Sequence, residues 1–181
     1  SLAHPGGNAT GVSGVLTELT AKRLELFHQM APHARRITCL INPTNPSGVQ
    51  QFEAAQRAAP TLGVRLVKRD VRNAGELDTA LRALPRGEGS GVFVTADGLF
   101  LVNKAKIARA VRVAKLPATV PFRDYHDDGV LMSYGLNSVE VGRKMAVYVD
   151  KILRGAKPSD LPIEQVSKYE LIINLRVARE L

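Results

Sequence analysis

Short apolar runs alternate with longer segments of helical periodicity along most of this chain. The runs at 37–41, 64–68, 91–95, 118–121 and 130–133 are almost continuously apolar, which is typical of strands that are buried on both faces. Between them, apolar residues recur at the three- and four-residue spacing of amphipathic helices. Helices are expected at 17–30, 46–59, 73–84, 99–114 and 137–153, with a helical turn at 123–127, a late strand at 169–173 and a last helix from 174.

Several helix boundaries are also encoded locally. Asn45 followed by Pro46 is an N-cap with proline at the first helical position. Asn73 and Glu76 have the spacing of a capping box, although Asn replaces the usual Ser or Thr. Pro32 is expected to end the first helix.

The alternation of strands and helices predicts the fold class. Continuous apolar strands separated by helices form a parallel sheet covered on both faces, so we expect an α/β, doubly wound architecture. The pattern does not determine the order of the strands. The stretch 157–162, which contains two prolines, is the one linker-like segment.

Composition sets limits on the class of partner. The chain has 181 residues, 45% of them hydrophobic and 5% aromatic, which is enough for one domain or two small lobes with an aliphatic core. The net charge of +8 raises the question of nucleic acid, but the basic residues are scattered in pairs. We therefore expect a solvated basic surface and no nucleic-acid partner, with an acidic partner or a membrane surface as the alternatives. No apolar run is long enough to span a membrane.

The usual signatures of catalysis and cofactor binding do not match. The glycines at 6, 7 and 11 lack the spacing of a phosphate-binding loop, and no strand precedes them. Cys39 lies inside a strand and is expected to be a small buried hydrophobic residue. Residues 126–128 (His-Asp-Asp) are better explained as a polar turn than as a metal site. We expect no enzyme activity, no cofactor and no metal.

Polar and aromatic residues do gather where predicted strands end. They are Asn42, Asn45, Asp97, Phe122 and Tyr134. The carboxyl ends of parallel strands lie along one edge of a sheet, where helix N-termini, a carboxylate and aromatic rings together favour a small-molecule site. Taken singly, each residue also has a structural explanation as a turn, cap, core or surface residue.

Four segments together carry a family resemblance: 3–11, 97–100, 131–135 and 157–175. The first resembles the Ala-Arg-Pro-Gly-Gly-Asn-Ile-Thr-Gly loop of one family of solute-binding proteins of ABC uptake transporters. The second resembles that family's Asp-Pro-Leu-Phe motif, with Gly98 in place of proline. The similarity extends over essentially the whole chain.

The resemblance implies a type I periplasmic-binding fold, in which two α/β lobes are hinged around a ligand cleft. It implies a non-enzymatic protein, periplasmic or otherwise extracytoplasmic, that captures an amino-acid-like solute and delivers it to an ABC permease. By position, Thr10 and Ser13 would lie at the mouth of the cleft and Asn42 and Asp97 on the edge of the second lobe. Phe122 and Tyr134 would lie near the hinge or on the wall that contacts a ring of the ligand. The alternative is a ligand-sensing effector domain of a transcription regulator or receptor with the same fold.

The resemblance also implies a division of the chain. Residues 1–15 would cross over from the first lobe, 16–131 would form the second lobe, and 132–181 would return to the first. Members of the family carry a further segment ahead of the opening loop, which forms most of the first lobe. We therefore expect exposed apolar surface on the 138–153 helix and the 169–173 strand, covered by self-association or by crystal contacts.

Overall fold

The computed structural model describes residues 2–14, 16–126, 128–166 and 168–181; Ser1 of the opening loop and Asp127 of the predicted polar turn lie outside these ranges. Contacts divide the chain into two compact units. The smaller unit comprises Ser1–Val15 and Leu136–Glu170, and the larger comprises Leu16–Gly135 and Leu171–Leu181. The expected return segment 132–181 is thus shared between the two units.

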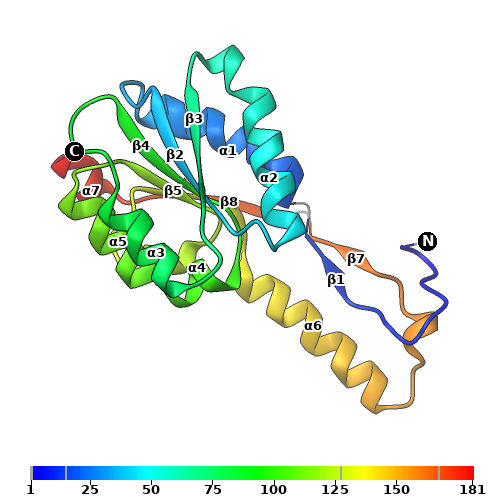
Figure 1. Cartoon of the computed structure of the whole chain (residues 1–181). Coiled ribbons are helices and arrows are strands. Elements are labelled where there is room, and N and C mark those ends of the chain that lie inside the picture. The colour runs from blue at the N-terminus through cyan, green and yellow to red at the C-terminus, as the bar shows by residue number, and fades with distance from the viewer. Residues whose placement is uncertain (1, 15, 127, 167) are drawn as a thin grey trace. The chain divides into compact units, whose positions relative to one another are not determined.

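The larger unit is built around a six-stranded sheet (Figure 1). Its strands are β2 Arg36–Ile41, β3 Arg65–Asp70, β4 Ser90–Val94, β5 Ala118–Val120, β6 Met132–Leu136 and β8 Tyr169–Ile173, of which β6 and β8 each extend past the unit boundary. Its helices are α1 Leu16–Met30, α2 Pro46–Ala58, α3 Ala74–Arg82, α4 Gly98–Val102, α5 Lys104–Val113 and α7 Leu175–Glu180, with single 3₁₀ turns η1 Pro60–Leu62 and η2 Arg123–Tyr125.

The strand order is β3-β2-β4-β5-β6-β8. The pairs β2–β3, β2–β4, β4–β5 and β5–β6 are all parallel, so the predicted parallel α/β sheet is confirmed. From β2 the chain first adds β3 on one side and then continues with β4 on the other side. The sheet therefore has its topological switch point between β2 and β4, which the sequence pattern alone does not reveal.

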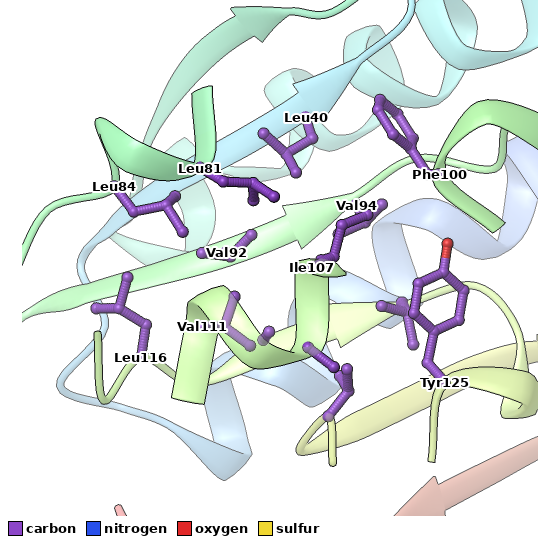
Figure 2. Packing of buried hydrophobic residues seen from close by; sticks show 14 of the residues in the cluster. Leu40, Leu81, Leu84, Val92, Val94, Phe100, Ile107, Val111, Leu116 and Tyr125 are labelled. Atoms are coloured by element: carbon purple, nitrogen blue, oxygen red, sulfur yellow. The ribbon is translucent and has the colours of Figure 1, made fainter. Parts of the chain in front are cut away.

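Helices cover both faces of this sheet because its strands are apolar on both sides. Val92 and Val94 of β4 pack with Leu77, Ile107 and the other residues of one core cluster, while Phe93 belongs to the opposite cluster. Figure 2 shows the first cluster, in which side chains from β2, β4, α4, α5 and η2 meet. Cys39 is fully buried in the second cluster, as predicted.

One basic residue departs from the expected solvated surface. Arg23 of α1 is only 2% exposed, and its guanidinium lies 4.0 Å from the centre of the Phe93 ring. It donates a hydrogen bond to the carbonyl oxygen of Val94 at 2.9 Å. Burial lowers the pKa of Arg23 to about 9, because the interior disfavours its charge. The ring and the carbonyl oxygen offset part of that desolvation.

Two element boundaries differ from those predicted. The helix expected at 99–114 is divided into α4 and α5 at Asn103, whose side-chain amide donates to the carbonyl oxygen of Leu99 at 2.8 Å. The strand expected at 130–133 is β6, Met132–Leu136. It continues through Gly135, where any Cβ would collide with the carbonyl group of Pro121.

The smaller unit contains β1 Val12–Ser13, α6 Ser138–Leu153, the 3₁₀ turn η3 Pro158–Asp160 and β7 Glu164–Gln165. Strands β1 and β7 pair in parallel, and neither was predicted from the sequence. Tyr148 of α6 donates to the carbonyl oxygen of Pro162 at 2.5 Å, and Lys144 of α6 pairs with Glu164 at 2.7 Å. These contacts hold one side of α6 against β7.

The other side of α6 carries exposed apolar residues, in agreement with the surface expected on this helix. Leu153 is 81% exposed, and Leu171 of β8 is 43% exposed. Within the described parts of the chain, no helix is long and apolar enough to cross a membrane.

Candidate ligand-binding edge

The carboxyl ends of β2 and β4 lie side by side at the topological switch point, where ligands bind in open α/β sheets. The chain continues from β2 into Asn42, Thr44 and Asn45, and from β4 into Ala96 and Asp97. We call these five residues the switch-point edge. Three of them, Asn42, Asn45 and Asp97, were predicted as site residues from the sequence.

Asn45 and Asp97 are joined directly, although they are far apart in the sequence. The Asn45 side-chain amide donates to Asp97 Oδ2 at 2.8 Å and to the carbonyl oxygen of Ala96 at 3.3 Å. Each residue also caps a helix: Asn45 Oδ1 accepts from the Ser47 amide at 3.0 Å, and Asp97 Oδ1 accepts from the Leu99 amide at 2.8 Å. The caps fix both side chains at the edge of the sheet.

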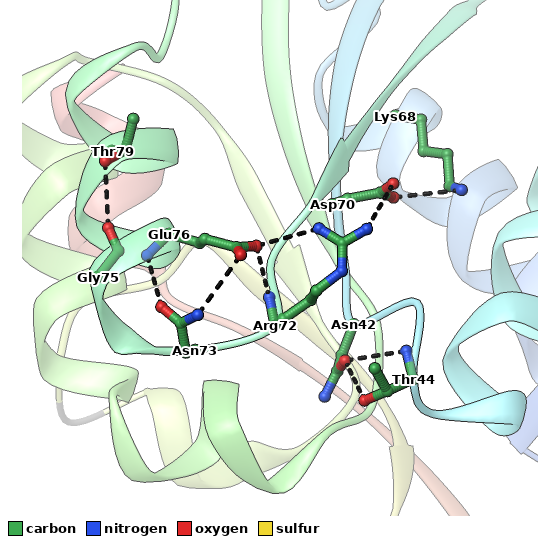
Figure 3. A network of polar contacts seen from close by, with 9 residues as sticks. All are labelled: Asn42, Thr44, Lys68, Asp70, Arg72, Asn73, Gly75, Glu76 and Thr79. Atoms are coloured by element: carbon green, nitrogen blue, oxygen red, sulfur yellow. Dashed lines mark hydrogen bonds and ion pairs between the residues drawn. The ribbon is translucent and has the colours of Figure 1, made fainter.

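Asp97 differs from Asp70, a carboxylate at the end of β3 in the same sheet. Asp70 pairs with Lys68 at 3.2 Å and with Arg72 at 3.8 Å, and Arg72 also pairs with Glu76 (Figure 3). Asp97 is half-buried and has hydrogen bonds from two N–H groups, but it has no ion pair among the described residues. Its negative charge is therefore available to a cationic group of a ligand.

Asn42 has a more local role than Asp97. Its Oδ1 accepts hydrogen bonds from the amide and the hydroxyl of Thr44, at 3.1 and 2.7 Å (Figure 3). This turn shapes the loop that leads to Asn45. The structure thus supports the reading of Asn42 as a turn residue, with its side-chain carbonyl already engaged.

Two buried side chains hold the segment that presents Asp97, and the sequence analysis identified neither. Gln51 of α2 is 1% exposed; its Oε1 accepts from the Ala96 amide at 3.0 Å, and its amide donates to Ser47 Oγ at 3.2 Å. Arg23 holds the carbonyl oxygen of Val94 in the same segment. The sequence signal that could have identified Gln51 is its position as a polar residue on the inward face of α2.

The predicted aromatic residues are placed by packing. Phe122 stands at the N-cap position of η2 and packs against the cluster that contains Tyr125, and Tyr134 of β6 packs against the opposite cluster. The two hydrogen bonds of Asp97 come from Asn45 and the Leu99 amide, not from either aromatic residue. Tyr125, which was not predicted, is fully buried; its hydroxyl has no hydrogen-bond partner among the described residues, and burial raises its pKa.

Thr10 and Ser13 belong to the smaller unit. Thr10 Oγ1 donates to the carbonyl oxygen of Leu161 at 2.7 Å, and Ser13 pairs with Gln165 in the β1–β7 ladder. The Thr10 hydroxyl therefore stabilises the fold of its own unit. The predicted role of both residues at a cleft mouth stays a prediction.

The larger cavities of the larger unit lie away from the switch-point edge. One of about 570 Å³ borders α5 and α7, and one of about 630 Å³ lies between α3 and α5. No predicted site residue lines either cavity. Among the described residues, no group of three or more His, Cys, Asp or Glu side chains could hold a metal ion.

Comparison with known proteins identifies the family. The family model for ABC transporter substrate binding proteins matches residues 1–181. The chain belongs to this family. The Tyrosine-binding protein of Clostridioides difficile is 24% identical over 174 residues, which cover 96% of this chain and 50% of that protein. The chain thus spans about half the length of this curated relative.

Two solved structures share the fold. An ABC domain from Streptococcus pneumonia in complex with L-Trp superposes with a TM-score of 0.82 at 22% identity, over 99% of this chain and 62% of that one. A conserved domain protein from Vibrio cholerae gives a TM-score of 0.87 at 24% identity, over 99% and 60% of the two chains. The periplasmic-binding-protein fold predicted from the family resemblance is confirmed.

Proposed function

We propose that this chain contributes the ligand-binding edge of the solute-binding component of an ABC uptake transporter, and that its solute is a small amino acid-like molecule. The observation that carries the proposal is the position of the Asn45–Asp97 pair at the switch point between β2 and β4. The names of the two relatives, one tyrosine-binding and one in complex with L-Trp, favour an aromatic amino acid as the solute.

The chemistry of the edge supports this choice of solute. A half-buried carboxylate without an ion pair is a suitable acceptor for the ammonium group of an amino acid. Two hydrogen bonds hold the Asp97 carboxylate in place before any ligand arrives, so little conformational entropy is lost on binding. A neutral sugar would gain much less from that charge. Asp97 is therefore the residue that selects a cationic group.

The family supplies the wider setting of the proposal. Capture of the solute would take place outside the cytoplasmic membrane, with transfer to a membrane permease and no chemical change in the solute. The alternative is an effector domain of a transcription regulator or receptor, which uses the same fold. Loss of uptake after deletion of the gene supports transport, whereas altered transcription with unchanged uptake supports the alternative.

Isothermal titration with L-tyrosine and L-tryptophan tests the site. Asp97→Asn removes the charge but keeps one oxygen for the cap of α4, so its affinity should fall about tenfold or more, as for the loss of a charge-assisted hydrogen bond. The control is Asp78→Asn, which removes an exposed carboxylate of α3 that pairs with Lys106. Equal affinity of Asp97→Asn and wild type would remove Asp97 from the site.

A further inference from the structure

Helix α5 lies between α3 and α7 in the larger unit, with a groove along each side of it (Figure 1). These grooves are the two cavities of about 630 and 570 Å³ described above. Arg109 and Val113 line both grooves, so they stand on the ridge that separates them. Both side chains are exposed, Val113 at 72%. We call the lining of the two grooves, with this ridge, the α5 face.

Basic side chains dominate the α5 face. Six basic residues line the two grooves against two acidic ones, Asp78 and Glu180, so the lining carries a net charge of +4. This is half of the net charge of +8 of the whole chain. The six, all of them exposed, are Arg82, Arg86, Lys106, Arg109, Arg112 and Lys115. Basic residues that are scattered along the sequence are therefore gathered on one face by the fold.

Most of these positive charges are not neutralised within the chain. Lys106 pairs with Asp78 at 2.7 Å, and the other five have no ion pair among the described residues. Lys115 follows the C-cap of α5 with a φ of 51°, a left-handed conformation that glycine usually supplies at this position. A lysine there strains the backbone, and such strain often accompanies a functional side chain.

The distribution of the charges indicates a broad partner. They line both grooves and the ridge between them, whereas an acidic helix seated in one groove would leave the other groove uncovered. An extended anionic surface can face all six basic side chains at once, with the apolar Val113 directed toward it. Anionic phospholipid headgroups form such a surface, and each Lys or Arg close to them strengthens binding by about fivefold.

The α5 face lies at the opposite end of the sheet from the switch-point edge. Leu116 and Leu131, which line one groove, directly precede β5 and β6. Asn45 and Asp97 instead follow the carboxyl ends of β2 and β4. A surface bound at the α5 face therefore leaves the switch-point edge uncovered.

We propose that the larger unit binds anionic phospholipid membranes through the α5 face, with Val113 against the headgroup region. This proposal goes beyond solute binding and does not depend on it, because no residue of the switch-point edge takes part. Binding of this kind is electrostatic, so it should weaken as the salt concentration rises.

Cosedimentation with vesicles tests the proposal with a matched pair of variants. The vesicles contain equal parts of phosphatidylglycerol and phosphatidylcholine, and vesicles of phosphatidylcholine alone are the reference. Arg109→Glu should weaken binding to the anionic vesicles about tenfold or more. Arg57→Glu makes the same charge change at an exposed site of α2, on the other side of the sheet, and should weaken binding less than about twofold. No binding by wild type, or equal losses in the two variants, would overturn the proposal.

Tryptophan fluorescence locates the contact, because the chain has no tryptophan of its own. The emission of Val113→Trp should shift to the blue when anionic vesicles are added. Val102→Trp is the control, since Val102 of α4 is 86% exposed but does not line either groove, and its emission should stay unchanged. Equal shifts in the two variants contradict the proposal.

Both measurements are repeated on the full-length product of the gene, so that any further segment is in place. Binding by this chain but not by the full-length product would show that the α5 face is covered, and the proposal would fail. Polyglutamate is the competing probe. Binding of polyglutamate without binding of anionic vesicles would replace the membrane by an acidic polypeptide as the partner.

Discussion

The two units of this chain bury their apolar residues to very different extents. In the larger unit a parallel sheet is covered on both faces, and residues such as Leu40, Phe93 and Ile107 are fully buried. In the smaller unit, the buried hydrophobic residues that the structure describes are Leu136, Tyr148 and Val166. The larger unit therefore has the core needed for independent stability, whereas the described part of the smaller unit buries few apolar side chains.

The difference bears on the candidate site. Fixed polar side chains at a sheet edge need a rigid support, and the larger unit supplies it through the cores on both faces. The proposed solute recognition therefore belongs to the larger unit.

The largest expected effect comes from replacing one leucine by alanine in each unit and comparing the two losses of stability. Leu77→Ala removes a fully buried side chain of α3 and should lower the free energy of unfolding by about 2–5 kcal/mol. Leu153→Ala removes a side chain that is 81% exposed and should change it by less than about 0.5 kcal/mol. Urea denaturation measures both losses. Similar losses would show that the units do not differ as described.

An intermediate loss of stability is expected when the segment that carries Asp97 loses its support from Gln51. Gln51→Met keeps the side-chain volume but leaves the buried amide of Ala96 without an acceptor, which should cost about 1–3 kcal/mol. Hydrogen exchange at Ala96 should become faster in the same variant. Gln29→Met is the control, because Gln29 lies on the exposed side of α1. Unchanged exchange at Ala96 would argue against the role of Gln51.

The smallest expected effect on stability comes from the Lys144–Glu164 ion pair of the smaller unit. The hydrogen bond from Lys144 lowers the pKa of Glu164 below its ordinary value. A carboxyl with a lowered pKa in the folded state adds stability above its unfolded pKa, and that stability is lost as the pH falls through the folded pKa. Wild type should therefore lose slightly more stability than Glu164→Gln on acidification. Thermal denaturation across the acidic range measures this difference.

A double-mutant comparison isolates the pair. Lys144→Met should reduce the same acid-dependent loss, because Lys144 makes the largest contribution to the lowered pKa of Glu164, and it should have no further effect on this loss in the Glu164→Gln background. If the loss of stability on acidification persists unchanged in Glu164→Gln, other carboxyl groups are responsible for it. The exposed position of the pair keeps the whole effect small.

Much of the fold follows from local sequence signals. The apolar runs gave the buried strands β2 and β4, and Asn45-Pro46 gave the start of α2, where Asn45 does cap the helix. Features that depend on contacts between residues far apart in the sequence could not be predicted from these local signals. The path of β6 beyond 133 depends on how closely Gly135 approaches Pro121, and the order of the strands depends on the packing of the whole sheet.

The candidate site likewise has residues that the local sequence predicts and features that depend on distant contacts. Asn42, Asn45 and Asp97 were identified because each follows a predicted strand. Their relation to the switch point, and the support from Gln51 and Arg23, depend on which strands become neighbours. Arg23 in particular looked like a surface residue, because its spacing on α1 does not reveal that its guanidinium would lie over Phe93.

The central claim is that the solute binds at the edge between β2 and β4. A nuclear magnetic resonance titration of the isotope-labelled chain with L-tyrosine locates binding directly. The backbone amides of residues 42, 44, 45, 47 and 48 and of 95–99 should shift together and saturate, with little change elsewhere in the larger unit. Shifts confined to the cavity that borders α5 and α7, or no shifts at all, would contradict it.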